Sequence, residues 1–191
     1  MRLATLVRLA ALGLVAALLA VLVYRLVRGP RSGIAQAAKA HREPRVPATG
    51  FRVLWTGAGA WPSGLTRPTV GTSLRLDQLR GYRLVVNFWA SWCEPCKREA
   101  PLLAAAATRQ RAHVAFIGVD VEDLASDARR FLRRHHVPYM VVRGGDSAVS
   151  RFGVVGLPET FYVDRTGRIR DVTEGPVTPS ILEHELGAGS S

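Results

Sequence analysis

Cysteine is nearly absent from this sequence, and its scarcity excludes several classes of site. The 191 residues include only Cys93 and Cys96, and the five histidines do not form a His-x₃₋₅-His pair. A closed structural zinc site needs four ligands, so one would require dimerisation. The two cysteines lie three positions apart and have no other cysteine to pair with in the monomer. Neither a zinc site nor a set of structural disulfides is therefore predicted.

Acidic residues are scarce at the N-terminus. Residues 1–50 hold eight Arg or Lys and only one acid, Glu43, a net charge of +7 out of the formal +11. Residues 51–191, with 18 basic and 14 acidic side chains, carry only +4. The basic residues are not interleaved with aromatic ones, and clusters such as Arg129-Arg130 are typical of a solvated helix face. No nucleic-acid partner is predicted.

One long hydrophobic run is present, and it lies near the N-terminus. The stretch Leu9–Val23 contains only Ala, Leu, Val and Gly, and with its flanks it extends over 3–27. As a helix it has the roughly 20 apolar residues that cross a bilayer core, so residues 1–28 are predicted to be a transmembrane signal anchor. Cleavage stays open as an alternative, because Ala38-Lys39-Ala40 has a small-x-small pattern. Arginines flank the run on both sides and do not decide its orientation.

The rest of the chain is predicted to be a linker and a single domain. Residues 29–50 are rich in Arg, Ala, Pro and Gly without a helical or strand period, which favours a linker, and residues 51–191 form the domain. No element is assigned within 51–72. The predicted strands are 84–89, 114–119, 139–142 and the hairpin 160–163 with 168–172, and the predicted helices are 94–108, 123–135 and 179–186. Alternation of strands with helices indicates an α/β domain with parallel strand pairs.

The two cysteines stand where a predicted strand gives way to a helix, in Trp92-Cys93-Glu94-Pro95-Cys96. A thiol on the first turn of a helix is favoured as thiolate by the positive end of the helix and its unpaired N–H groups. Cys93 is therefore the predicted nucleophile. Cys96, one turn inward, is predicted to attack the mixed disulfide and release the partner. Metal delivery and a pair of inert core thiols remain as alternatives.

Three neighbours of the cysteines have predicted supporting roles. Glu99 follows Cys96 by one helical turn, so its carboxylate is placed to accept or return the proton of that thiol, unless it is a solvated surface residue. Trp92 is predicted to shield the disulfide and frame a docking surface. Glu94 and Pro95 are expected to set the local electrostatics and the backbone rigidity, without covalent roles.

Two separated motifs in the same order carry a family resemblance. Leu76-Asp77-Gln78-Leu79-Arg80-Gly81 leads into Val86-Asn87-Phe88-Trp89-Ala90-Ser91-Trp92-Cys93-Glu94-Pro95-Cys96, and Gly156-Leu157-Pro158-Glu159-Thr160-Phe161 follows later. Over about residues 70–186 the chain resembles the thioredoxin superfamily, and within it the TlpA/ResA/CcmG group. The resemblance implies a thioredoxin-like α/β fold, a central mixed sheet flanked by helices. It also implies a redox-active Cys93–Cys96 disulfide that needs no organic cofactor and no metal.

The second motif implies a substrate-binding loop. In the family a cis proline precedes a main strand beside the cysteines, and it maps onto Pro158 after Leu157. Its backbone neighbours pair with an incoming peptide in the family. An ordinary trans turn is the alternative. Glu159 is a family-like residue that either contacts the partner or is a plain surface charge.

The resemblance also implies a biological role. It suggests a protein-disulfide reductase that acts on thiols and disulfides of extracytoplasmic clients such as apocytochrome c. A membrane electron donor of the DsbD/CcdA kind would re-reduce it. The expected location is the cell membrane, single-pass, with the catalytic domain on the extracytoplasmic side. The alternatives are a thiol peroxidase, which would show a lone cysteine after Pro-x-x-x-Thr, a copper binder, which would show Cys-x-x-x-Cys, and a redox-silent module.

Overall fold

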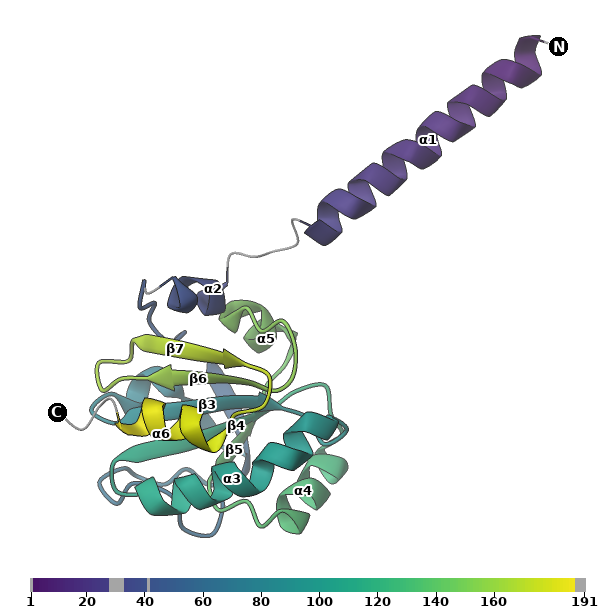
Figure 1. The fold of residues 1–191 in the computed structure, drawn as a ribbon. Coiled ribbons are helices and arrows are strands. Elements are labelled where there is room, and N and C mark those ends of the chain that lie inside the picture. The colour runs from purple at the N-terminus through teal and green to yellow at the C-terminus, as the bar shows by residue number, and fades with distance from the viewer. Residues whose placement is uncertain (1, 28–32, 41, 188–191) are drawn as a thin grey trace. The chain divides into compact units, whose positions relative to one another are not determined.

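A computed structural model describes residues 2–27, 33–40 and 42–187, and it divides into two units, 1–31 and 32–191 (Figure 1). The first unit contains one helix, α1 (Arg2–Val27). Within the described residues, no helix meets the length and apolarity that a membrane crossing requires. The transmembrane helix predicted at 1–28 is therefore not confirmed, and its end residues, like the last four residues of the predicted domain, lie outside the described part of the chain.

The second unit is an α/β domain. Its strands are β1 (Gly50–Trp55), β2 (Ser73–Arg75), β3 (Arg83–Trp89), β4 (Val114–Asp120), β5 (Met140–Arg143), β6 (Glu159–Val163) and β7 (Ile169–Glu174). Its helices are α2 (Ile34–Lys39), α3 (Glu94–Gln110), α4 (Ala125–Arg134), α5 (Asp146–Phe152) and α6 (Pro179–Gly187), with a 3₁₀ turn at Leu76–Leu79. The predicted strands and helices are found in the predicted order. The structure also contains α2, β1, β2 and α5, which were not predicted.

The seven strands form one mixed sheet in the order β2-β1-β5-β4-β3-β6-β7. β3, β4 and β5 are parallel, as the alternation predicts, and the outer strands pair antiparallel. The predicted hairpin is β6–β7. The mixed thioredoxin-like sheet flanked by helices is thus confirmed.

Helices cover both faces of this sheet, so the central strands are buried on both sides and read as continuous apolar runs. Leu84, Val86 and Phe88 of β3 face the core beneath α2 and α5, whereas Val85 and Trp89 face the core beneath α3, α4 and α6. In Figure 1 the helices α3, α4 and α6 cover one face of the sheet. Both ends of β3 therefore emerge between two helical layers.

A glycine in the middle of β4 makes room for a tryptophan next to the active site. A Cβ atom on Gly118 would lie 2.9 Å from Nε1 of Trp89 and 3.0 Å from Cγ2 of Val141. Strand glycines often mark such close approaches. The absence of a side chain there leaves room for the Trp89 indole, which packs against Phe131 with ring centroids 4.4 Å apart.

Part of the segment predicted as a linker is ordered on the domain. Ala35 and Ala38 of α2 are buried in the core, and Arg45 forms an isolated bridge with Arg168. A close backbone contact fixes the start of α2, because a Cβ on Gly33 would lie 2.5 Å from Cα of Gly153. The exact boundaries of anchor, linker and domain stay predictions.

Candidate active site

The two cysteines form a disulfide at the carboxyl end of β3. The strand ends at Trp89, and α3 begins at Glu94 with Cys93 as its N-cap. The sulfurs of Cys93 and Cys96 are 2.05 Å apart, and the Cys93 Sγ accepts a hydrogen bond from the Cys96 N–H (3.3 Å). Both residues are almost fully buried, with 4% and 2% of their surfaces exposed. A sulfur at a helix N-terminus is favoured as thiolate once the bond is reduced.

Three other residues of the motif flank the two cysteines. Trp92 is 57% exposed beside the disulfide, and its Nε1 donates to the carbonyl of Glu122 (3.0 Å). Pro95 lies in the first turn of α3. Glu94 is exposed and pairs with Lys97 at 2.8 Å, and the hydrogen bond from Lys97 lowers the pKa of Glu94. The functions assigned to Trp92, Glu94 and Pro95 stay predictions.

Glu99 is buried, which removes the alternative that it is a solvated surface residue. Only 3% of it is exposed, and its two carboxyl oxygens accept hydrogen bonds from Asn87 Nδ2 and from the Val177 N–H, both at 2.9 Å. Burial raises the pKa of Glu99 to about 7, although these two hydrogen bonds oppose the shift. A carboxyl that exchanges its proton near neutral pH, one turn after Cys96, suits proton transfer with that thiol.

The group that holds Glu99 extends under the cysteines. Asn87 Nδ2 also donates to Thr160 Oγ1 (2.9 Å), and so links β3, β6 and α3. A cavity of about 10 Å³, close to the size of one water, is lined by Asn87, Cys96 and Tyr139 among others. Burial, then the charge of Glu99, raises the pKa of Tyr139. Sequence reasoning missed Asn87, although a polar residue inside a buried apolar strand is a usable signal.

The second motif lies at the same end of the sheet. The Leu157–Pro158 peptide bond is cis, as the resemblance implies. Glu159 is not the plain surface charge of the one alternative, because it is 1% exposed. Its contact with a partner stays a prediction. Its Oε2 accepts from the Val155 N–H (3.0 Å), and Oε1 has no hydrogen-bond partner among the described residues. Burial raises the pKa of Glu159 to about 7.

A further acid that sequence reasoning missed holds the loop before the nucleophile. Asp123 accepts hydrogen bonds from the N–H (2.6 Å) and the hydroxyl (2.9 Å) of Ser91. It lies in the loop after β4, whose carboxyl end adjoins that of β3 because the strands are parallel. The loops after β3, after β4 and before β6 therefore meet around the disulfide.

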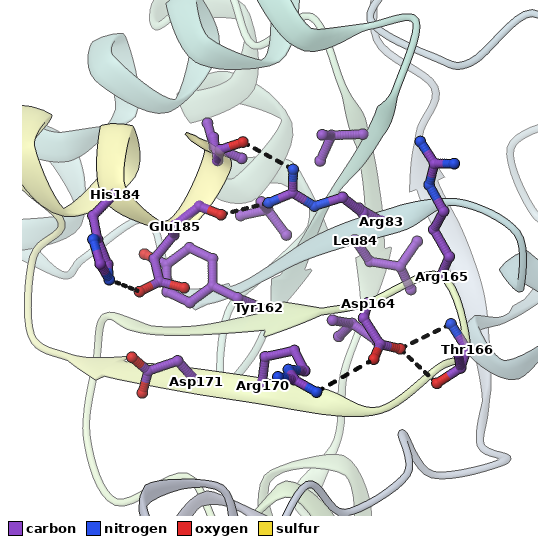
Figure 2. A pocket seen from close by; sticks show the side chains of 14 residues that line it. Arg83, Leu84, Tyr162, Asp164, Arg165, Thr166, Arg170, Asp171, His184 and Glu185 are labelled. Atoms are coloured by element: carbon purple, nitrogen blue, oxygen red, sulfur yellow. Dashed lines mark hydrogen bonds and ion pairs between the residues drawn. The ribbon is translucent and has the colours of Figure 1, made fainter. Parts of the chain in front are cut away.

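A larger cavity, of about 710 Å³, lies at the opposite end of β3 (Figure 2). It is lined by residues from the start of β3, the β6–β7 turn and α6, and neither cysteine is among them. Across the described ranges 2–27, 33–40 and 42–187, no three His, Cys, Asp or Glu side chains are grouped to hold a metal ion.

Comparisons with known proteins agree with this geometry. The Redoxin family model matches residues 47–187. The thiol:disulfide interchange protein DsbE of Pseudomonas fluorescens biotype C is 36% identical over 125 residues, which are 63% of this chain and 68% of that protein. The thiol-disulfide oxidoreductase ResA of Bacillus subtilis strain 168 is 30% identical over 123 residues, 63% of this chain and 69% of the relative.

A solved structure gives the same result for the fold. The structure of MTB DsbF in its mixed oxidised and reduced forms superimposes with a TM-score of 0.62 at 26% identity, and the match covers 75% of this chain and 98% of the other. The family model spans most of the chain and includes both motifs around the Cys93–Cys96 disulfide. The chain belongs to the Redoxin family and is a thiol–disulfide oxidoreductase related to DsbE and ResA.

Proposed function

We propose that this oxidoreductase is a membrane-anchored reductase that delivers electrons to disulfides of extracytoplasmic client proteins. The observation that carries the proposal is the pairing of a buried disulfide with a buried carboxyl. Cys93 and Cys96 lie at the start of α3, and Glu99 lies one turn further with its oxygens bound to Asn87 and Val177. A nucleophile, a resolving thiol and a proton acceptor therefore stand on one helix.

The reaction starts from the reduced dithiol. The Cys93 thiolate attacks one sulfur of the client disulfide and forms a mixed disulfide, and the other client sulfur leaves as a thiolate. Glu99 accepts the proton of Cys96, whose sulfur then attacks Cys93 Sγ. The Cys93–Cys96 bond forms, the second client sulfur leaves, and protonation yields two client thiols. Two electrons pass from the dithiol to the client.

The membrane anchor is supported by the sequence of the first unit. The stretch Leu9–Val23 contains only Ala, Leu, Val and Gly, within the 26-residue helix α1. Protein disulfides form and persist mainly in oxidising compartments outside the cytoplasm. A reductase of such disulfides therefore needs its catalytic domain on the extracytoplasmic side. A reductase there must be re-reduced continually, so an anchor that keeps it beside a membrane electron donor of the DsbD/CcdA kind has a clear use.

The client class is proposed from the family resemblance. Relatives named DsbE and ResA are the basis for a reductase of the cytochrome c maturation type, with apocytochrome c as client. The disulfide itself is nearly buried, so a client sulfur has to approach it closely between the side chains that cover it. An extended segment makes such an approach more readily than a folded surface, which suits an unfolded apoprotein.

The decisive experiment is the reduction potential of the Cys93–Cys96 couple in the full chain, held in detergent. It is measured by equilibration with glutathione or dithiothreitol buffers followed by thiol alkylation. A value near or below the glutathione range supports the reductase, and a value as positive as about −120 mV makes the protein a disulfide donor instead. Failure to form the disulfide reversibly overturns the exchange mechanism and favours a metal-binding role.

Location needs a separate test in cells. A membrane-impermeant maleimide is applied to intact cells or spheroplasts after mild reduction, and labelling of Cys93 is compared with that of lysed cells. Full labelling of a membrane-fraction protein without lysis supports the extracytoplasmic domain. Labelling only after lysis overturns the proposed side, and recovery in the soluble fraction overturns the anchor.

A further inference from the structure

A buried acid lies behind the loop that carries the nucleophile, and the reaction described above does not use it. Asp120 is the last residue of β4 and lies in register with Trp89, the last residue of β3. Its side chain is fully buried. The nearest counter-charge is Arg143 on β5, whose Nη1 lies 3.2 Å from Asp120 Oδ2.

The acid adjoins the contacts that fix the active-site loop. Asp123 accepts two hydrogen bonds from Ser91, and its own carbonyl accepts one from Arg143 Nη2 (2.8 Å). The next residue of the active-site loop, Trp92, donates to the carbonyl of Glu122. The two residues before Cys93 are therefore tied to the loop after β4 by three hydrogen bonds, two of which end on the Asp123 carboxylate.

The carboxyl of Asp120 has no donor that satisfies it. Neither Oδ1 nor Oδ2 has a hydrogen-bond partner among the described residues, and Arg143 Nη1 has none either. Arg143 joins the two acids, because its Nη1 faces Asp120 Oδ2 and its Nη2 donates to the carbonyl of Asp123. Neighbouring carboxyls repel when both are ionised and attract when they share one proton. Two carboxylates beside one guanidinium leave a buried negative charge, which is costly, whereas a shared proton makes the group neutral.

The charges that act on Asp120 agree with this arrangement. Burial, more than any other effect, raises the pKa of Asp120 to about 7, with Arg143 from β5 opposing the shift and Asp123 from the following loop adding to it. β3 presents the uncharged Trp89 in register, and the loop after β3 presents Ser91, which is bonded to Asp123. The proton therefore resides on Asp120 below neutral pH.

We propose that Asp120 is a positioning residue for disulfide exchange: when protonated it donates to Asp123 and completes the group that holds Ser91 and Trp92 in front of Cys93. The inference rests on the proposed exchange at Cys93. When Asp120 ionises, the two carboxylates repel, Asp123 moves away, and Ser91 loses its two bonds. The order of the loop then depends on pH independently of Glu99.

The test observes the loop that holds Ser91 and Trp92 directly. It uses the oxidised full-length protein, in which the cysteines do not titrate. The Ser91 amide and the Trp92 indole N–H are followed by nuclear magnetic resonance between pH 5 and pH 9, in detergent. Wild type should show both signals moving with a common midpoint near pH 7. In Asp120→Asn, whose amide donates without titrating, both signals should stay at the wild-type low-pH positions. Glu99→Gln serves as the matched control and should leave the midpoint unchanged.

A rate measurement accompanies the spectra. At pH 6, Asp120→Ala should slow attack of the reduced protein on a small aromatic disulfide by on the order of tenfold, whereas Asp120→Asn should stay within about twofold of wild type. Unchanged titration of both signals in Asp120→Asn overturns the inference, as does loss of the midpoint in Glu99→Gln. If Asp120→Ala does not fold, the Asp120→Asn titration decides. Absence of exchange at Cys93 overturns the proposed function instead, because the titration needs no catalysis.

Discussion

The two ends of β3 differ in the surroundings that they give to charged side chains. At the carboxyl end, Glu99, Asp120 and Glu159 are buried with few hydrogen-bond donors, and burial raises each pKa to about 7. At the other end lies the larger cavity, where Arg83 donates to the carbonyls of Glu185 and Leu186 at the end of α6 (Figure 2). The larger hollow is therefore not the reactive one.

The turn beside that cavity shows the contrast in a single residue. Asp164 accepts hydrogen bonds from the Thr166 N–H and hydroxyl and from the Arg168 N–H, at 2.7–3.0 Å. Burial alone would raise the pKa of Asp164, but these bonds outweigh it and lower the pKa. Asp164 is partly exposed, whereas Glu99, Asp120 and Glu159 are almost fully buried. Burial therefore dominates at the carboxyl end, even at Glu99, where both oxygens accept hydrogen bonds. The pKa of each acid follows its burial weighed against its donors, and not the volume of the nearby cavity.

The largest expected difference between the two ends is in turnover. Cys93→Ser removes the nucleophile and should lower the rate of disulfide reduction by on the order of 10³-fold or more. Cys96→Ser should leave the first attack intact and accumulate a mixed disulfide with the client, visible by non-reducing electrophoresis and mass spectrometry. A Cys93→Ser protein that still turns over, or a Cys96→Ser protein that accumulates no adduct, would contradict the assigned order of attack.

The next largest effect is expected from removing the proton acceptor, Glu99. Glu99→Gln keeps the shape of the side chain but cannot accept a proton, so the release step should slow by roughly 10²-fold at pH 8. Because Glu99 must be ionised to act, the wild-type release rate should rise with pH around a midpoint of about 7, and the variant should lose that rise. Stopped-flow measurement of release from a preformed mixed disulfide gives both results. The exposed Glu183→Gln on α6 is the control, and an unchanged pH profile in Glu99→Gln would refute the role.

Stability should respond to pH with opposite signs at the two ends. Folding raises the pKa of Glu159 from its ordinary 4.5 to about 7, so its favourable contribution is complete below about pH 4.5 and is lost as the pH rises through 7. Glu159→Gln should therefore unfold with a free energy about 1–3 kcal/mol above that of wild type at pH 8 and close to it at pH 4.5. Urea denaturation at both pH values measures the difference.

Asp164→Asn is the matched variant at the cavity end. The pKa of Asp164 is lowered on folding, so its ionised form stabilises the native state above its ordinary pKa of 3.8, and this is lost as the pH falls. The variant should lose about 1 kcal/mol at pH 8 and less at acidic pH. Equal signs for Glu159→Gln and Asp164→Asn at pH 8 would remove the distinction between the two ends.

The elements next to the cysteines could be predicted because their signals are local. The run 84–89 became β3 with one residue added, since a strand buried on both faces is apolar throughout. The helix predicted at 123–135 is observed at Ala125–Arg134. In contrast, α2 and β1 have short, weak patterns, and their order depends on distant contacts such as the Arg45–Arg168 bridge.

The site was predictable to the same extent. The cysteine pair and Glu99 are linked by helical spacing alone, so the sequence places them together. The bonds from Asp123 to Ser91, and the position of Asp120 beside them, depend on the register of β3 against β4, which no local pattern reveals. The burial of Glu159 could not be predicted, because burial of a charged residue next to a loop is decided by the packing of the whole sheet.

The smallest effect is expected at the larger cavity. It tests whether that cavity contributes to turnover. Arg165 is exposed on the β6–β7 turn and repels Arg83, whose pKa is lowered first by burial and then by this neighbour. Arg165→Ala should change the free energy of unfolding by no more than about 0.5 kcal/mol, as surface substitutions usually do. Turnover with a protein disulfide should stay within about twofold of wild type, because the residue touches neither the disulfide nor the three buried carboxyls. A tenfold loss of turnover in a folded Arg165→Ala protein would mean that the cavity takes part in client binding, and chemistry would then occupy both ends of β3.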